Sequence, residues 1–423
     1  MLSGFSRRAR PTALAARRNR TRGLAVSCLL GALAISSAGE APSAAAADAQ
    51  QWYLSAMKAD EMWKSSRGKG VKVAVIDSGV NPNTPSLKGQ VLADEVHASV
   101  SYGVTEDYTG HGTSMAELIA GTGAGGGLKG LAPDAKILPY RVVFDSDLKD
   151  KAEISKTSTS AEAIRAAADS DAKIISMSYG SPGDTAEEEA AVKYAHSKGK
   201  LMFAAVGNDA ERKSLIDYPA AYPYVVGVAA VDATGKVAKF SEHGNYVDLA
   251  APGLNIPGWC DTSFRSYCER EGTSAATAIT SASAALVWSA HPDWTANQVL
   301  GSLIDTAGRD WARDDPSIYL GYGLVRPRKV LENENFKPGA PDTDPLAKEN
   351  VTGVLDESGK PVAPSPTASP QPSKDTSGSE AQPVASDADD SGNTTLWVAL
   401  GAAAAVLVIG GGAFAVVRSR RGA

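Results

Sequence analysis

The sequence predicts a doubly wound α/β fold with a mostly parallel central sheet. Continuous apolar runs of six or seven residues alternate along the chain with longer segments whose apolar residues recur at helical spacing. Strands that are apolar on both faces are typical of parallel sheets covered by helices on both sides. We expect strands at 71–76, 137–143, 173–178, 201–206 and 225–231. We expect helices at 111–121, 160–170, 186–199, 274–290 and 295–307.

The first 47 residues have the composition of a secretory signal peptide. They carry seven Arg, an apolar stretch at 24–37 and small residues up to Ala47. The fourteen residues of the apolar stretch are few for a helix that must cross a bilayer, although an uncleaved anchor stays an alternative. We therefore predict a signal peptide over 1–47, cleaved near Ala47.

The C-terminal part of the chain predicts a tether to the membrane. Residues 337–395 contain nine Pro and many Ser, Asp, Thr and Gly, which is the composition of a disordered linker. Residues 396–417 are 22 uncharged residues, and a helix of that length is about 33 Å long, enough to span a bilayer. The three Arg of the tail, 418–423, indicate a cytoplasmic C-terminus. We expect a single-pass protein of the cell membrane whose folded domain, 48–336, is extracytoplasmic.

The charge and the cysteine content exclude some functions for the folded domain. The net charge is −6 over the whole chain, with +6 in residues 1–47 and +3 in the tail, which leaves −15 between them. Because nucleic-acid binding needs a basic face, this acidic domain is not expected to bind nucleic acid. Cys260 and Cys268 are not at zinc-ligand spacing. In an oxidising compartment, a disulfide between them is the better interpretation.

Four polar residues follow predicted strands or begin predicted helices. Asp77 comes directly after the first predicted strand, Asn208 closely follows the fourth, and His111 and Ser274 begin helices. Because ligands of open α/β sheets bind beyond the carboxyl ends of the strands, we expect these side chains to meet there. A Ser hydroxyl becomes a nucleophile when a His takes its proton, and a carboxylate orients that His. Each residue alone is more often a cap or turn former, but together they predict nucleophilic catalysis.

The segments around these residues resemble the motifs of subtilisin-like serine proteases. They are VAVIDSGV (73–80), GHGTSMAELIAG (110–121), AAVGND (204–209) and GTSAATA (272–278). The order Asp, His, Ser is the one known for subtilisin. The likeness covers about 55–330. The N-terminal segment 51–77, the Cys pair, the Pro-rich linker and the C-terminal apolar stretch resemble the mycosins, the membrane-anchored subtilases of type VII secretion systems.

The resemblance implies a role for each motif residue. Asp77, His111 and Ser274 would form the catalytic triad of a serine endopeptidase, and Asn208 with the backbone amide of Ser274 would form the oxyanion hole. A peptide substrate would bind as an extra strand between two segments. These segments are Ser176, Met177, Ser178, Tyr179 and Gly180 on one side, and Ala204, Ala205, Val206 and Gly207 on the other. Further expected partners are the membrane and a type VII secretion complex, and no cofactor or metal is expected.

Two positions depart from the family pattern. Ala278 stands four residues after Ser274, where the family usually has Pro, and Glu117 stands where it usually has Gly. Only about 25 residues separate the predicted cleavage from the first strand, too few for a folded subtilisin propeptide. These departures keep open a second hypothesis, a mainly structural component of the secretion complex with weak or dispensable peptidase activity. An α/β-hydrolase esterase is excluded because the sequence has no GxSxG.

Overall fold

The computed structural model describes residues 51–143, 150–212 and 217–353, together with Leu355 and Lys360. The predicted signal peptide, the predicted membrane span at 396–417, the basic tail and most of the predicted linker lie outside the described residues. In the part of the chain that is described, no helix is both long and apolar enough to cross a bilayer.

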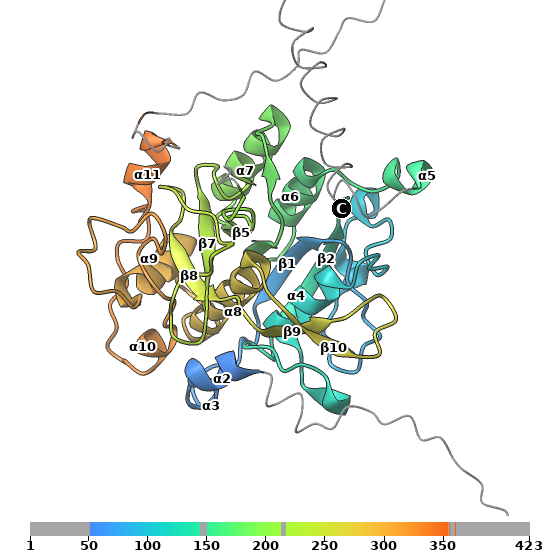
Figure 1. The fold of residues 1–423 in the computed structure, drawn as a ribbon, viewed down its shortest axis with the longest axis horizontal. Helices are drawn as coiled ribbons and strands as arrows, with labels where there is room; N and C mark the ends of the chain where they lie inside the picture. The colour runs from blue at the N-terminus through green and yellow to red at the C-terminus, as the bar shows by residue number, and fades with distance from the viewer. Residues whose placement is uncertain (1–50, 144–149, 213–216, 354, 356–359, 361–423) are drawn as a thin grey trace, which may run out of the picture. The chain divides into compact units, whose positions relative to one another are not determined.

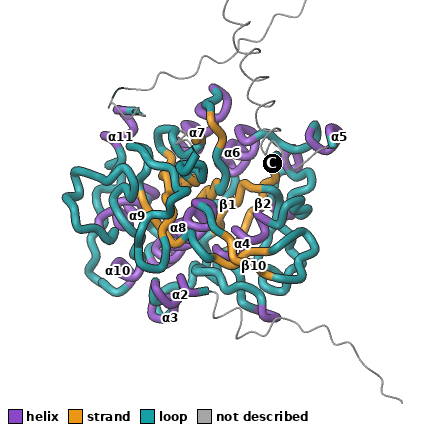
Figure 2. Tube along the Cα trace, viewed as in Figure 1, coloured by secondary structure: helices purple, strands orange, loops and turns teal. Residues whose placement is uncertain are grey.

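A six-stranded sheet forms the centre of the domain (Figures 1 and 2). Its order is β2-β1-β3-β5-β7-β8, and every neighbouring pair is parallel. The strands are β1 (Lys72–Asp77), β2 (Lys136–Arg141), β3 (Ile174–Met177), β5 (Leu201–Ala205), β7 (Val225–Val231) and β8 (Leu249–Pro252). All five predicted strands are present, with ends shifted by at most two residues. Strand β8 was missed because its four residues, LAAP, are too short a run to stand out.

Helices cover both faces of the sheet, which confirms the predicted doubly wound arrangement. One face packs against α4 (His111–Ala120), α8 (Thr273–Ala290) and α9 (Ala296–Thr306), and the other against α6 (Ser160–Asp169) and α7 (Ala186–Ser197). Each face of the sheet has its own hydrophobic core, the first under α4, α8 and α9 and the second under α6 and α7. Alternate side chains of β1 point to opposite faces, so Val73 and Val75 lie in the first core while Ala74 and Ile76 lie in the second. This is why the predicted strands are continuously apolar.

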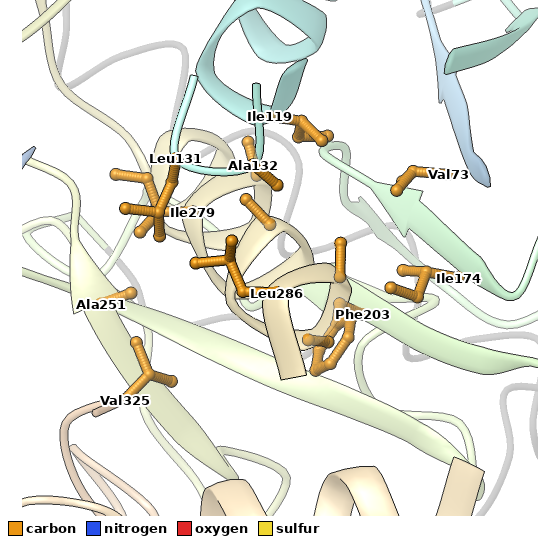
Figure 3. Packing of buried hydrophobic residues seen from close by; sticks show 14 of the residues in the cluster. Val73, Ile119, Leu131, Ala132, Ile174, Phe203, Ala251, Ile279, Leu286 and Val325 are labelled. Carbon is orange, nitrogen blue, oxygen red and sulfur yellow. The ribbon is translucent and has the colours of Figure 1, made fainter. Parts of the chain in front are cut away.

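Helix α8 runs through the first core, and 15 of its 18 residues are buried. Small side chains allow it to lie close to the sheet, where Figure 3 shows Ile174 and Phe203 beside the helix that carries Ile279 and Leu286. Three hydroxyl groups of α8 inside the core are satisfied because they donate to the carbonyl four residues earlier, as Thr280 Oγ1 does to Ala276 O at 2.9 Å. This packing fixes the position of the first turn of α8.

Shorter elements complete the domain. The short helices are α2 (Trp52–Ala56), α3 (Ala59–Met62), α5 (Lys151–Ile154), α10 (Arg328–Leu331) and α11 (Ala347–Thr352), with 3-10 turns at Ala93–Glu95, Ala98–Val100 and Ala124–Gly126. Two antiparallel ribbons are formed by β4 (Ser181–Pro182) with β6 (Asp217–Tyr218), and by β9 (Ile256–Trp259) with β10 (Tyr267–Arg270). The β9–β10 ribbon lies between β8 and α8 in the sequence and borders the site described below.

The folded part of the chain continues past residue 336, so the predicted start of the linker at 337 is wrong. Leu346 is 2% exposed and belongs to the first core. Asn350, on α11, accepts a hydrogen bond from the backbone N–H of Tyr224 at 2.7 Å. Asn245 Nδ2 donates to the carbonyl of Gly353 at 2.7 Å. These few contacts hold the segment against the domain. The prediction was wrong because it used the average composition of 337–395, which is Pro-rich and does not show individual contacts.

Candidate active site

The structure brings the predicted catalytic residues to one edge of the sheet. Asp77 is the last residue of β1, and β2 lies on one side of β1 while β3 lies on the other. His111 is the first residue of α4, and Ser274 is the second residue of α8. Asn208 follows β5, the next strand but one from β1. The meeting point is the carboxyl edge where the chain reverses its direction across the sheet, which is the usual binding position in such folds.

A buried carboxylate holds the His111 ring. His111 Nδ1 lies 2.8 Å from Asp77 Oδ1, and the Asp77 side chain is fully buried. The backbone N–H of Ser78 donates to the same oxygen at 2.7 Å. A Cβ at Gly112 would lie 2.2 Å from the carbonyl oxygen of Gly79 and 3.0 Å from Asp77 Cβ, so only Gly allows this close approach of α4 to β1.

Burial and the Asp77 carboxylate act in opposite directions on the pKa of His111. Burial lowers the pKa of His111, but the charge and the hydrogen bond of Asp77 outweigh it and leave the pKa raised above 6.5. Asp107 adds to the rise, while Arg270 lowers the pKa. Because the side chain is still 38% exposed, the ring can reach a group that enters from solvent. These properties suit a general base near neutral pH.

Asp107 organises the turn that precedes His111, although it was not among the predicted site residues. Its Oδ1 accepts from the backbone N–H of Gly110 at 2.8 Å and from Ser78 Oγ at 2.8 Å. Its Oδ2 accepts from Thr113 N at 2.8 Å and Thr113 Oγ1 at 2.6 Å. A carboxylate that accepts from the first turn of a helix compensates its unpaired N–H groups. The spacing of Asp107 four residues before His111, just ahead of a helix, is the signal that could have indicated it.

Ser274 lies in the first turn of α8, where backbone N–H groups have no partner within the helix. Its hydroxyl donates to the carbonyl of Ser178 at 2.9 Å, and Ser178 Oγ donates to the carbonyl of Ser274 at 3.1 Å. Among the described residues, Ser274 Oγ forms no hydrogen bond with the His111 ring. A rotation of the Ser274 side chain is therefore needed before His111 can take its proton.

The orientation of the Asn208 amide follows from its neighbours. The backbone N–H of Thr273 donates to Asn208 Oδ1 at 2.9 Å, and Thr273 Oγ1 donates to the same atom at 3.0 Å. Both Thr273 groups are donors here, so the Asn208 atom that faces them is the amide oxygen. The Asn208 NH₂ group is therefore directed away from Thr273 and remains available as a donor. Asn208 is exposed and lines the same cleft as Ser274.

The residues face a cleft of about 330 Å³ between α4, the start of α8 and the β9–β10 ribbon. Its lining residues include His111, Asn208, Ser274, Trp259 and Arg270. The last two come from the ribbon and were not predicted as site residues. The structure joins Cys260 and Cys268 in a disulfide, with Cα atoms 5.1 Å apart, which confirms the interpretation from spacing. The disulfide ties the turn of this ribbon.

Glu117 connects helix α4 to the same ribbon. Glu117 is a charged residue where the family usually has Gly, and the structure gives its carboxylate partners. Its Oε2 accepts from Tyr267 OH at 2.8 Å, and its Oε1 accepts from Thr84 Oγ1 at 2.7 Å. Tyr267 stacks on Trp259 with ring centroids 3.9 Å apart. Ala278 likewise disturbs nothing, since α8 passes through it without a break.

The predicted substrate-binding segments are too wide. Their first parts lie inside the sheet, where Ser176 pairs with Phe203 and Met177 pairs with Ala204. Ser176, Met177, Ala204, Ala205 and Val206 are each at most 2% exposed. Backbone groups already paired with neighbouring strands cannot also pair with a peptide. Outside these sheet-paired residues the segments leave Ser178, Tyr179, Gly180 and Gly207, of which Gly180 is exposed.

Within the described ranges, no group of three or more His, Cys, Asp or Glu side chains is arranged to hold a metal ion.

Comparison with known proteins identifies the family. Residues 68–337, more than half of the chain, match the sequence model of the subtilase family. The chain belongs to the subtilase family. It is 33% identical to thermitase of Thermoactinomyces vulgaris over 278 residues, which are 64% of this chain and 95% of thermitase. It is 35% identical to the major intracellular serine protease of Bacillus subtilis (strain 168) over 241 residues, 55% of this chain and 73% of that protein.

Solved structures show the same fold. The MycP3 protease from the type VII (ESX-3) secretion system matches this subtilase with a TM-score of 0.54 and 31% identity, over 66% of this chain and 87% of MycP3. MycP1 with its N-terminal propeptide removed matches with a TM-score of 0.55 and 27% identity, over 69% of this chain and 99% of MycP1. This subtilase is therefore a serine endopeptidase with a subtilisin-like α/β domain, as the motifs predicted.

Proposed function

We propose that this subtilase cleaves peptide bonds through an acyl-enzyme formed on Ser274, with His111 as the base and Asp77 as the group that orients it. The observation that carries the proposal is the 2.8 Å contact between His111 Nδ1 and buried Asp77 Oδ1. With the Nδ1 proton donated to Asp77, the ring keeps Nε2 as a free acceptor for the Ser274 proton. His111 and Ser274 line the same cleft, so the transfer needs only the rotation of Ser274 away from Ser178.

The reaction then follows from these positions. Ser274 Oγ attacks the peptide carbonyl carbon while its proton moves to His111 Nε2, and His111 returns that proton to the leaving amine as the C–N bond breaks. Water repeats the sequence on the acyl-enzyme. The negative charge on the carbonyl oxygen would be met by the Asn208 NH₂ group and by the Ser274 backbone N–H at the start of α8.

A fluorophosphonate probe tests the catalytic assignment on the full-length chain. Such a probe forms a covalent bond only with an activated serine, so mass spectrometry should find one adduct on Ser274. The Ser274→Ala variant is the matched control and should carry no adduct. Its turnover should fall about 10⁶-fold, the loss measured when the nucleophile of subtilisin is removed. A folded wild-type protein that stays unlabelled would contradict the proposal.

We further propose that the chain is a mycosin-like protease of a type VII secretion system, held at the cell membrane by residues 396–417. The support is the likeness to the MycP3 and MycP1 structures, together with 22 uncharged residues followed by three Arg. A chain that ends at residue 395 should leave the membrane fraction on cell fractionation, whereas the full-length chain should stay in it. Equal distribution of the two would refute the anchor.

The role in secretion needs a separate comparison of three strains. One carries the wild-type gene, one the Ser274→Ala variant and one a deletion. Loss of secretion in both altered strains would support a catalytic requirement. Loss in the deletion strain alone would favour the structural role in the secretion complex. Unchanged secretion in the deletion strain would refute any role in secretion.

A further inference from the structure

The segment 344–353, called the C-terminal latch below, meets the domain at a group of acidic side chains. The latch contains α11 and packs against the connection from β6 to β7 and against Asp248, the residue before β8. Its own carboxylates, Asp344 and Glu349, lie close enough to Asp248 to act on its ionisation. Asp248 and Glu349 line one small cavity of about 30 Å³. Docking of the latch therefore brings two acids to a third that the domain already holds.

The two latch carboxylates are bound as acceptors. Asp344 Oδ1 accepts from the backbone N–H of Leu346 at 2.9 Å, and its Oδ2 accepts from Asn350 Nδ2 at 2.6 Å. Glu349 Oε1 accepts from the hydroxyl of Tyr322, and its buried Oε2 has no hydrogen-bond partner among the described residues. Because an ionised carboxylate only accepts hydrogen bonds, these contacts suit the charged form of both side chains.

Asp248 is the acid that has to keep its proton while the latch is docked. It is 4% exposed, and its Oδ2 accepts from the backbone N–H of Gly227 at 2.8 Å. Burial raises the pKa of Asp248 well above its usual range, and Glu349 and Asp344 raise it further, against the hydrogen bond from Gly227. Departure of the latch removes both negative charges and admits water. The pKa of Asp248 is therefore higher in the docked form than in the released form.

The surroundings supply no positive charge that would offset these acids. The other titratable groups of the cavity and of its hydrogen bonds are phenols: Tyr222, Tyr246 and Tyr322. Arg313 lowers the pKa of Tyr322, but its guanidinium pairs with Asp305 at 3.0 Å. Among the described residues, none of the ion pairs includes Asp248, Asp344 or Glu349. Ionisation of Asp248 in the docked form would thus be opposed by like charges alone.

The remaining contacts of the latch are few enough for one proton to decide its state. Leu346 is its one side chain in the first core, and Asn350 and Gly353 each accept a single hydrogen bond from the domain. Helix α11 has six residues, and Val351 on it is 88% exposed. A helix of that length is not stable by itself in water. The latch is therefore ordered only as long as its docking contacts outweigh the repulsion between its acids and Asp248.

We propose that the C-terminal latch is a pH-sensitive device, docked while Asp248 is protonated and released when Asp248 ionises. Because the pKa is higher in the docked form, the contribution of Asp248 to docking is complete below the released-state pKa. It is lost as the pH rises through the docked-state pKa. Between these two values, the ratio of released to docked latch should rise about tenfold per pH unit, since one proton is lost.

Release would change the connection between the domain and the proposed membrane anchor. The latch precedes the segment that carries residues 396–417, and its ten residues can extend by up to about 35 Å. The latch does not depend on the proposed role of Ser274, so its test does not use catalysis.

Hydrogen exchange followed by mass spectrometry tests the latch on the wild-type full-length chain. The protection factor of residues 346–353 is obtained at pH 5 and pH 8 by dividing each rate into the intrinsic rate at the same pH. We expect it to fall by at least about tenfold from pH 5 to pH 8. Helix α8, which lies inside the first core, should stay protected at both values. Unchanged protection of 346–353, or an equal fall in α8, would overturn the proposal.

Asp248→Asn assigns the effect to one proton. Asn keeps an acceptor for Gly227 but cannot ionise, so the protection factor of 346–353 should change by less than about twofold between the two pH values. The control is Asp342→Asn, which removes an exposed carboxylate just ahead of the latch and should follow wild type. A fall in Asp248→Asn as large as in wild type would refute the role of Asp248.

A second variant lies on the latch itself and leaves the interior of the domain intact. Glu349→Gln keeps an acceptor for Tyr322 and removes one of the charges that face Asp248. The docked latch should then tolerate ionisation of Asp248 better, and protection of 346–353 at pH 8 should exceed that of wild type by about tenfold. Protection equal to or below that of wild type would mean that charge repulsion does not open the latch, and would overturn the proposal.

Discussion

Glu117 makes the stability of the domain depend on pH, and its replacement by Gln should remove the part of that dependence that Glu117 causes. The side chain is fully buried on α4, where it accepts from Thr84 and Tyr267. Burial raises the pKa of Glu117 from 4.5 to about 7, against the lowering effect of these hydrogen bonds. The folded protein therefore retains this proton at pH values where the unfolded chain has released it.

The sign and size of the effect follow from this shift. Below pH 4.5 the carboxyl is protonated in both states, so its contribution to folding is fully present there. As pH rises through about 7 the buried group must ionise, and stability falls by about 3 kcal/mol in total. About 2 kcal/mol of this loss belongs to the interval from about pH 5.5 to 8.5.

Urea unfolding followed by Trp fluorescence measures the effect. The free energy of unfolding is determined at both ends of that interval for wild type, Glu117→Gln and the exposed control Glu187→Gln. Gln keeps an acceptor for Tyr267 but has no titrating proton, so the drop in stability should shrink by about 2 kcal/mol in Glu117→Gln. The control should follow wild type. Other buried acids, such as Asp217 and Asp248, titrate alike in all three proteins and cancel in the comparison.

The reasoning would be refuted if the free energy of unfolding fell by the same amount between the two pH values in wild type and in Glu117→Gln. That result would mean that Glu117 titrates near its ordinary value, and hence that water reaches it in the folded protein. A uniform loss of stability in Glu117→Gln at both pH values is compatible with the reasoning, because only the difference between the two pH values reports the proton.

Four further predictions concern the catalytic groups and the ribbon. Asp77→Asn should lower kcat on a good peptide substrate by about 10⁴ because the His111 tautomer is no longer fixed, while unchanged turnover would contradict its role. Asn208→Ala should lower kcat by about 10² to 10³, the loss known for an oxyanion donor of subtilisin, with KM little changed. A pH profile of kcat/KM should show an acid limb with an apparent pKa above 6.5, since His111 must be neutral to act as a base; a limb below that value would count against the Asp77 contact. Replacing both Cys260 and Cys268 by Ser should lower the free energy of unfolding by about 2–3 kcal/mol in urea denaturation, and an unchanged value would show that the ribbon holds without its disulfide.

The main secondary structure and the catalytic motifs were determined by local sequence. Buried parallel strands need apolar residues on both faces, so each leaves a continuous run that is visible without any partner. His111 and Ser274 could be placed at helix starts because the helical spacing of apolar residues begins just after each of them. The order Asp77, His111, Asn208, Ser274 then pointed to the chemistry, because few other reactions require that set.

Only the tertiary structure decided which further groups surround the site. The position of Asp107 just ahead of a helix could have indicated a cap for Gly110 and Thr113, but not that the same carboxylate also accepts from Ser78. Asp217 lies 37 residues from Gly180 in sequence, yet its carboxylate lies directly against that glycine. The physical reason is that motifs and periodicity are local properties of a chain. The wall of a cleft, the partner of a buried carboxyl and the end of a folded segment are set by contacts between segments that no local pattern brings together.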